Sequence, residues 1–99
     1  MKRMKIRRDA CPVTKTAALL SDVHTMLITR EILTGPKRFC ELERSIEGIS
    51  TRTLAAKLKK MEHDDILRKT KDGIYAATKK GAALRIVERA MRRYGELYL

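Results

Sequence analysis

The sequence predicts a mainly α-helical domain with one small β-hairpin. A short helical pattern, a glycine turn and a longer helical pattern run from Gly35 to Asp65, and the longer pattern has one apolar edge and one cationic edge. Two short strand patterns then flank Asp72-Gly73, a dipeptide typical of tight hairpins. A helix-turn-helix followed by a two-stranded wing indicates a winged helix-turn-helix.

Size and charge limit the partners. The 99-residue chain carries 23 Lys and Arg against 12 Asp and Glu, a formal net charge of +11. A basic domain of this size most often binds a polyanion, most commonly nucleic acid. The alternative is a generally solvated basic surface, but the cations cluster on particular elements. Because Trp is absent and aromatic residues make up 4%, the core is expected to be aliphatic and small. A small core often gains stability from a second subunit, so we expect a homodimer.

Metal, cofactor and membrane chemistry are not expected. Cys11 and Cys40 form neither a CxxC pair nor a Cys/His cluster, so the sequence predicts no metal and no cofactor. No stretch approaches the roughly 20 apolar residues of a membrane span, and no apolar run directly follows the basic N-terminus. We expect a cytoplasmic protein with reduced thiols. The chain has no Asn or Gln, which is a thermophile tendency and leaves a Cys11–Cys40 disulfide open.

The chain divides into an arm, residues 1–9, and a domain, residues 10–99. The arm is dense in cations, which do not fold alone. It is either a solubilising tail or a segment that follows phosphates beside the main contact.

The first two helices are expected from Cys11-Pro12 to Leu20 and from Asp22 to Thr34. Pro suits a first helical turn, and Asp22 is a good cap. The first helix is apolar on more than one side, which predicts burial on both faces, with a second subunit as a candidate partner. The second is expected to pack Val23 inward with its other apolar residues and to end at Gly35-Pro36.

The central helix pair is expected at residues 37–46 and 51–64. Ser50 is a strong cap for the longer helix, and Leu54, Leu58 and Met61 form its packing edge. The opposite edge mixes cations with small side chains, which lets a helix approach a surface closely.

The wing is expected from strands at residues 66–70 and 74–78. Thr78 then caps a last helix of about 20 residues that begins at Lys79. Its apolar stripe predicts a dimer seam.

The second helix of such a pair can enter the major groove, where its N-terminal residues meet base edges. We expect Arg52 and Thr53 to read bases, and the small Ala56 to allow close approach. The other expected DNA-binding residues would hold phosphates: Lys37, Arg38, Ser50, Thr51, Lys59, Lys60, Lys69 and Lys71.

These same segments resemble the HxlR family of winged-helix transcriptional regulators, which is close to the MarR type. The resemblance covers residues 11–84, and GPKRFCEL…GISTRTL is its most specific part. It implies a homodimer built mainly from the first and last helices, a pseudo-palindromic operator, and Thr51–His63 as the recognition helix. Two departures stand out: Asp22-Val23-His24 replaces the usual Gly-Lys-Trp, and the wing is cut to Thr70-Lys71-Asp72-Gly73.

Some members of this family carry a cysteine at the start of the first helix, and some of those sense oxidants or electrophiles. A thiol at a helix N-terminus near Arg7 and Arg8 is expected to have a lowered pKa. The alternative for Cys11 is an inert, packed thiol. Cys40, beside Phe39, is expected in the core.

The leading hypothesis is a dimeric, sequence-specific DNA-binding transcriptional regulator. The alternatives are a sequence-indifferent architectural DNA binder, a thiol-based sensor that acts through Cys11, and an interaction module that does not bind DNA. An enzyme is not expected, because no nucleophile, pocket signal or glycine-rich phosphate loop accompanies the acidic pairs. The sequence does not identify a small-molecule effector.

Overall fold

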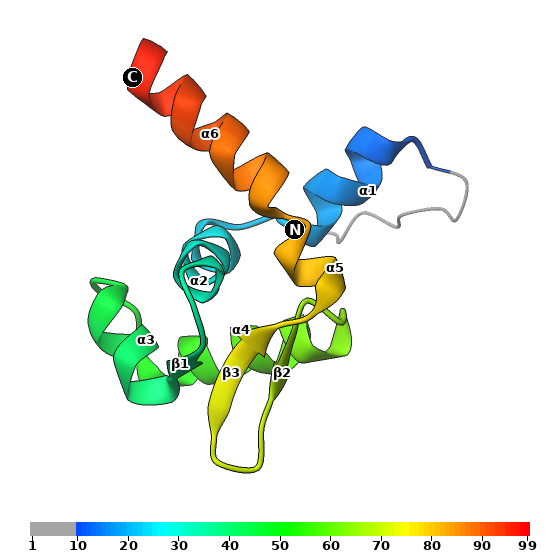
Figure 1. The fold of residues 1–99 in the computed structure, drawn as a ribbon. Coiled ribbons are helices and arrows are strands. Elements are labelled where there is room, and N and C mark those ends of the chain that lie inside the picture. Colours follow the sequence, from blue (N-terminus) through cyan, green and yellow to red (C-terminus); the bar gives the residue numbers. More distant parts are fainter. Residues whose placement is uncertain (1–9) are drawn as a thin grey trace.

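A computed structural model of the protein describes residues 10–99, and the expected basic arm at residues 1–9 lies outside the described residues. The helix pair and the hairpin gather in one body, while α1 and α6 project away from it (Figure 1). The predicted winged helix-turn-helix is therefore confirmed. The elements are α1 (Pro12–Leu19), α2 (Val23–Leu33), β1 (Lys37–Arg38), α3 (Phe39–Ser45), α4 (Thr51–His63), β2 (Leu67–Lys69), β3 (Ile74–Ala77), α5 (Lys79–Ala82) and α6 (Arg85–Tyr98).

Side-chain caps begin three of the helices where the sequence predicts them. The Asp22 carboxylate accepts the Thr25 N–H at 2.8 Å, the Ser50 hydroxyl accepts the Thr53 N–H at 3.0 Å, and the Thr78 hydroxyl accepts the Gly81 N–H at 3.0 Å. Each bond satisfies a backbone donor that has no partner within the helix. The helix boundaries are thus set by local chemistry.

The expected helix at residues 37–46 is wrong in its first two residues. Lys37 and Arg38 form β1, which pairs antiparallel with β3, so the three-stranded sheet has the order β1-β3-β2. The helix begins only at Phe39, because the Glu41 carboxylate accepts the Arg38 N–H at 2.8 Å and holds Arg38 extended as the cap residue. The edge of β3 that β2 does not occupy forms hydrogen bonds with this extended pair, and a local sequence pattern does not reveal such a partner.

The core lies between α2, α3, α4 and the hairpin. The predicted packing edge of α4 is confirmed, because Leu54, Leu58 and Met61 are all buried. On α2 the buried face includes two threonines, and the Thr29 hydroxyl donates to the Thr25 carbonyl at 2.8 Å. The prediction that Val23 packs inward is wrong: its side chain is 70% exposed.

The predicted last helix is broken into α5 and α6. A Cβ at Gly81 would lie 1.8 Å from the Ile66 carbonyl oxygen, so only glycine allows α5 to lie this close to the start of β2. The Leu84 N–H then bonds to the Gly81 carbonyl at 3.0 Å, a three-residue spacing that tightens the chain. Arg85 donates to the Leu33 carbonyl at 3.1 Å and fixes the start of α6 against the end of α2.

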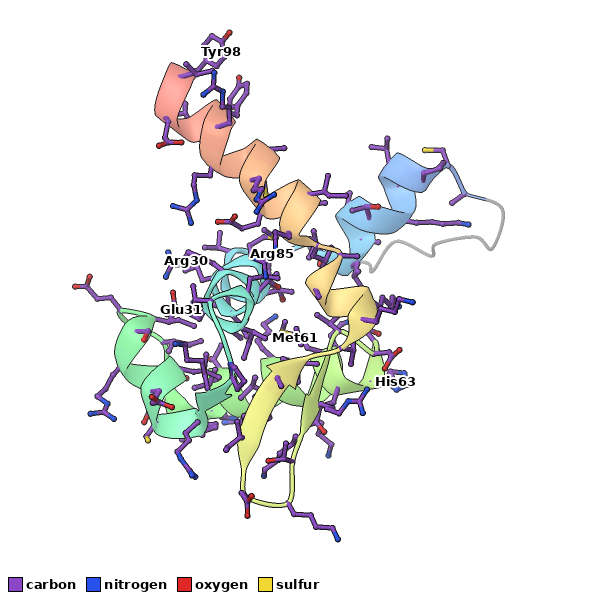
Figure 2. All side chains as sticks on the ribbon, viewed as in Figure 1. Arg30, Glu31, Met61, His63, Arg85 and Tyr98 are labelled. Atoms are coloured by element: carbon purple, nitrogen blue, oxygen red, sulfur yellow. The ribbon has the colours of Figure 1, made fainter. Side chains whose placement is uncertain are left out.

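The helices α1 and α6 bury none of their own residues. Val13 on α1 is 77% exposed, so the predicted burial of the first helix on both faces is wrong for the single chain. On α6 the exposed apolar side chains reach to the end of the helix, where Figure 2 shows Tyr98 far from the body. No helix within residues 10–99 is long and apolar enough to cross a membrane.

Candidate nucleic-acid interface

The outer edge of α4 is exposed along its length. Arg52, Ala56 and Lys59 are exposed and, at about 100° per residue, lie opposite the buried leucines. His63 is exposed at the C-terminal end of the helix (Figure 2). Among residues 10–99 the Arg52 guanidinium has no hydrogen-bond partner. It is therefore available to an external acceptor.

The hydroxyl groups at the start of α4 are already engaged within the protein. Ser50 donates to the Thr53 hydroxyl at 2.9 Å, and Thr53 itself is half-buried. The Thr51 hydroxyl donates to the carboxylate of Glu43 on α3. No local sequence pattern marks this contact, because the two partners are eight positions apart and lie on different helices.

The wing turn is held by backbone bonds and by Arg38. The Gly73 N–H bonds to the Thr70 carbonyl at 3.0 Å, and Gly73 adopts a φ of 77°, so the turn closes with glycine in the left-handed region. The Arg38 guanidinium donates to the Asp72 carbonyl at 3.1 Å. Arg38, expected to hold a phosphate, thus supports the turn that carries the exposed Lys71.

The other cations predicted to bind DNA differ in their burial and in their contacts within the protein. Lys37 is half-buried in β1. Lys60 forms an ion pair at 2.8 Å with Asp64, the cap residue that follows the end of α4. The Lys69 ammonium lies 5.7 Å from the centre of the Tyr75 ring. Arg68 is a further exposed cation on β2. The sequence does not predict it as a DNA-binding residue, because a strand of three residues shows no clear alternation.

A second ion pair connects α4 to the start of α2. The Lys57 ammonium lies 2.8 Å from the Asp22 carboxylate. Partial burial acts to raise the pKa of Asp22, but the hydrogen bonds from Lys57 and Thr25 outweigh it and hold that pKa below its ordinary value. Thirty-five positions separate the partners, so the sequence pattern could not reveal the pair.

Cys11 is the cap residue of α1 and is exposed, as a reactive thiol requires. Its sulfur lies 3.0 Å from the Thr14 hydroxyl and accepts the Thr14 N–H at 3.4 Å. The Thr14 hydroxyl, followed by the Thr14 backbone, lowers the pKa of the Cys11 thiol. The expectation that Cys40 lies in the core is wrong, because Cys40 is exposed on α3. Both cysteines are free thiols.

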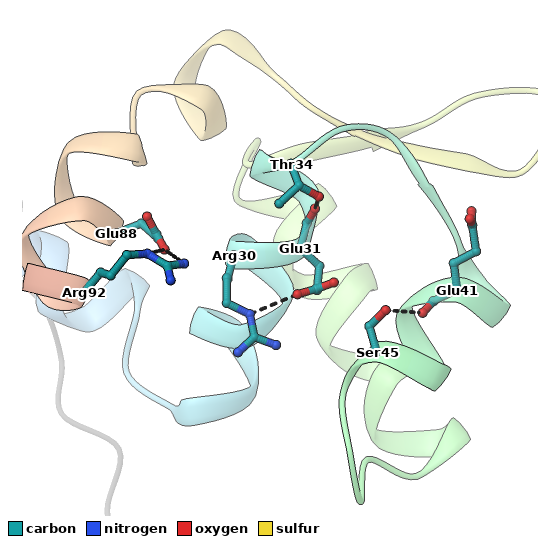
Figure 3. A network of polar contacts seen from close by, with 7 residues as sticks. All are labelled: Arg30, Glu31, Thr34, Glu41, Ser45, Glu88 and Arg92. Atoms are coloured by element: carbon teal, nitrogen blue, oxygen red, sulfur yellow. Dashed lines mark hydrogen bonds and ion pairs between the residues drawn. The ribbon is translucent and has the colours of Figure 1, made fainter. Parts of the chain in front are cut away.

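A shallow groove of about 250 Å³ lies between α2 and α6. Figure 3 shows the Arg30–Glu31 pair on α2 and the Glu88–Arg92 pair on α6 near this space. Its lining residues are Met26, Leu27, Arg30, Glu88, Met91 and Arg92. Among the described residues, no three His, Cys, Asp or Glu side chains come together as a metal site would require.

Known proteins are similar to this chain in sequence and in fold. The HxlR-like helix-turn-helix family matches residues 19–99. The HTH-type transcriptional regulator YodB of Bacillus subtilis (strain 168) is 33% identical over 95 residues, which cover 89% of this chain and 85% of that protein. The crystal structure of quinone-bound YodB superimposes with a TM-score of 0.80 and covers 90% of this chain and 100% of that one.

Two further structures extend the comparison. A proposed transcriptional regulator of the MarR family from Porphyromonas gingivalis W83 superimposes with a TM-score of 0.85 at 26% identity, covering 97% of this chain and 100% of that one. The redox regulator HypR in its reduced form has a TM-score of 0.79 at 25% identity, covering 87% and 91% of the two chains. HypR has also been solved in its oxidised form.

Proposed function

The chain belongs to the HxlR-like helix-turn-helix family and is a DNA-binding transcriptional regulator, and from this premise we propose that it binds a pseudo-palindromic site as a homodimer with α4 in the major groove. The relatives named above are transcriptional regulators rather than enzymes, and DNA as the partner makes the cytoplasm the proposed compartment.

The Arg52 side chain, which is exposed on the outer edge of α4 and has no hydrogen-bond partner among residues 10–99, is the observation that carries the proposal. Two alanines, Ala55 and Ala56, follow close behind it and leave room for the helix to approach base edges. An arginine in the major groove pairs best with guanine, through two parallel hydrogen bonds. Lys59, Lys60, Lys69 and Lys71 would hold phosphates on either side, and these contacts would supply most of the affinity.

The homodimer is proposed from the exposed apolar side of α6. A helix that leaves Tyr94 60% exposed, with four further large apolar side chains beside it, is stabilised by burial against a second apolar surface. Most soluble homo-oligomers are two-fold symmetric, and a two-fold dimer of helix-turn-helix proteins binds two half-sites about one helical turn apart.

The deciding experiment is selection of bound fragments from random duplex DNA. We expect an enriched sequence with two inverted half-sites about 10 base pairs apart, one helical turn. Binding without any enriched sequence at moderate salt would contradict the proposal and favour the sequence-indifferent architectural protein.

A thiol switch is a second candidate function, favoured by the exposed Cys11 with its lowered pKa. A larger thiolate fraction makes a cysteine a better target for oxidants and electrophiles. The quinone-bound state of YodB and the two redox forms of HypR fit the same reading.

The test is DNA affinity before and after mild peroxide or quinone treatment. We expect the treated protein to lose affinity, Cys11→Ser to keep it, and Cys40→Ser to behave like the unaltered chain. Equal affinity in all samples would contradict the thiol-switch proposal without contradicting the proposal that the protein binds DNA.

A further inference from the structure

We propose that Asp22 is a positioning residue of the DNA interface, which orients the recognition helix α4 through its ion pair with Lys57. This inference rests on the proposed function of α4. Asp22 lies in the turn between α1 and α2, where it is the cap residue of α2.

Two polar contacts flank the buried edge of α4. With successive residues about 100° apart around a helix, Thr51 and Lys57 lie roughly 60° to either side of Leu54. Thr51 is bonded to Glu43 of α3, and Lys57 to Asp22 at the start of α2. The buried leucines alone resist movement of α4 away from the core, whereas contacts on opposite flanks also resist rotation of α4 about its own axis.

Both oxygens of the Asp22 carboxylate accept hydrogen bonds. One carboxylate oxygen accepts the Thr25 N–H at 2.8 Å, and the other accepts the Thr25 hydroxyl at 3.1 Å and the Lys57 ammonium at 2.8 Å. The two bonds from Thr25 therefore hold the Asp22 carboxylate in the orientation in which it accepts the Lys57 ammonium. The side chains of Lys57 and Asp22 are 29% and 35% exposed, so water screens the pair only in part.

Rotation of α4 matters because few side chains are available to read bases. Arg52 lies about 160° from Leu54, on the outermost line of the helix. A small roll carries its guanidinium sideways across the groove, and bidentate recognition of guanine tolerates little displacement. Phosphate contacts are more tolerant, so a loosened helix is expected to lose specific binding first.

The test is made with Asp22→Asn and Lys57→Met in the full-length chain. Asparagine caps a helix as well as aspartate, so the α2 cap stays while the ion pair is lost. Affinities are measured for the selected site and for random duplex, at a temperature where unfolding curves show every variant folded. We expect each variant to bind the selected site about three- to tenfold more weakly, and the double variant no more weakly than either single one.

The direction in which Asp22→Asn changes DNA affinity distinguishes a positioning role of Asp22 from a simple effect of its charge. Removing a negative charge from a DNA-binding protein ordinarily strengthens binding, so weaker binding to the selected site supports positioning. The matched control is Glu31→Gln, which removes the same charge and breaks the Arg30 pair within α2. It is expected to leave the preference for the selected site unchanged.

Two results would overturn the inference. One is an Asp22→Asn variant that is less stable yet, when folded, binds the selected site as well as the unaltered chain. The other is a Lys57→Met variant that weakens selected and random DNA equally while Asp22→Asn weakens neither, which would make Lys57 a phosphate contact. If the unaltered chain bound no duplex even at low salt, the proposed function itself would fail, a result distinct from both.

Discussion

At the scale of single residues, the side chains at the start of α4 divide the work between holding the helix and reading DNA. Ser50 and Thr53 bond to each other and Thr51 bonds to Glu43, whereas the Arg52 guanidinium is free among the described residues. A hydroxyl that is already bonded must exchange partners to reach DNA, while a free guanidinium loses only water. Arg52 is therefore expected to contribute most of the base discrimination.

We expect Arg52→Ala to cost about 1–3 kcal/mol of binding free energy on the selected site and to relax the sequence preference. Lys59→Ala is the matched control, because a phosphate contact would be lost equally on selected and random DNA, with the salt slope reduced by about one. Fluorescence anisotropy titrations at several salt concentrations measure both. A selected-to-random ratio that stays the same in Arg52→Ala would refute the base-reading role.

The reactivity of Cys11 is expected to depend on Thr14. Because the Thr14 hydroxyl is the largest cause of the lowered pKa, Thr14→Val should raise that pKa and reduce the thiolate fraction near neutral pH. Iodoacetamide alkylation followed by peptide mass analysis reports the rate at each cysteine. We expect slower alkylation of Cys11 in the variant and an unchanged rate at Cys40, which is the internal reference. An unchanged rate at Cys11 would mean that this hydrogen bond does not control its reactivity.

At the scale of elements, two backbone contacts make the structure differ from the one that the helical pattern of the sequence predicts. The extended pair Lys37–Arg38 joins the wing as β1, and Arg38 bonds to the wing turn at Asp72. Gly81 lets α5 contact the start of β2, after which the chain turns and α6 leaves in a new direction (Figure 1). The short wing is thus supported from outside its own two strands.

Gly81→Ala is expected to destabilise the fold although alanine favours helices. The added Cβ would overlap the Ile66 carbonyl oxygen, and relief requires α5 or β2 to move. Overpacking of this kind costs about 1–3 kcal/mol, more than the roughly 1 kcal/mol gained in helix propensity. Urea unfolding measures the difference.

The control for Gly81→Ala is Gly95→Ala in α6, where, apart from the backbone of the same helix and the adjacent residues, no atom of residues 10–99 lies within 4 Å of the added Cβ. That variant is expected to gain up to about 1 kcal/mol in stability. If both variants proved equally stable, close contact at Gly81 would not be the reason for its glycine.

At the scale of the whole molecule, the single chain has a buried core and two helices left largely open. The core is formed by α2, α3, α4 and the hairpin, while α1 and α6 bury none of their residues. The cationic edge of α4 and the apolar side of α6 are thus separate surfaces. We interpret one as the DNA contact and the other as the contact with a second copy.

We expect Tyr94→Glu to convert the proposed homodimer to a monomer, because a charge in the middle of the apolar side of α6 would lose its hydration on association. Arg89→Glu, on the polar side of the same helix, is the matched control and should remain dimeric. Analytical ultracentrifugation at micromolar concentration distinguishes the two states. A Tyr94→Glu variant that sediments like the unaltered dimer would exclude this side of α6 as the interface.

By itself, the sequence determined the features that depend on residues within a few positions of each other. The caps at Asp22, Ser50 and Thr78, the two edges of α4 and the turn at Gly73 are of this kind. Side-chain caps, helical periodicity and glycine at positive φ act over short stretches, and a local pattern records them. The fold class and the exposed Arg52 followed from these features.

Only the tertiary structure decided which distant groups meet. The pairing of β1 with β3, the contact of Gly81 with Ile66, and the bonds from Asp22 to Lys57 and from Arg38 to Asp72 join segments that are far apart in the chain. Their partners come together only after the core has packed, and several are backbone groups, which every residue carries. The same reason explains why Cys40 and Val23 are exposed: burial depends on which neighbouring elements cover a face, not on the residue type alone.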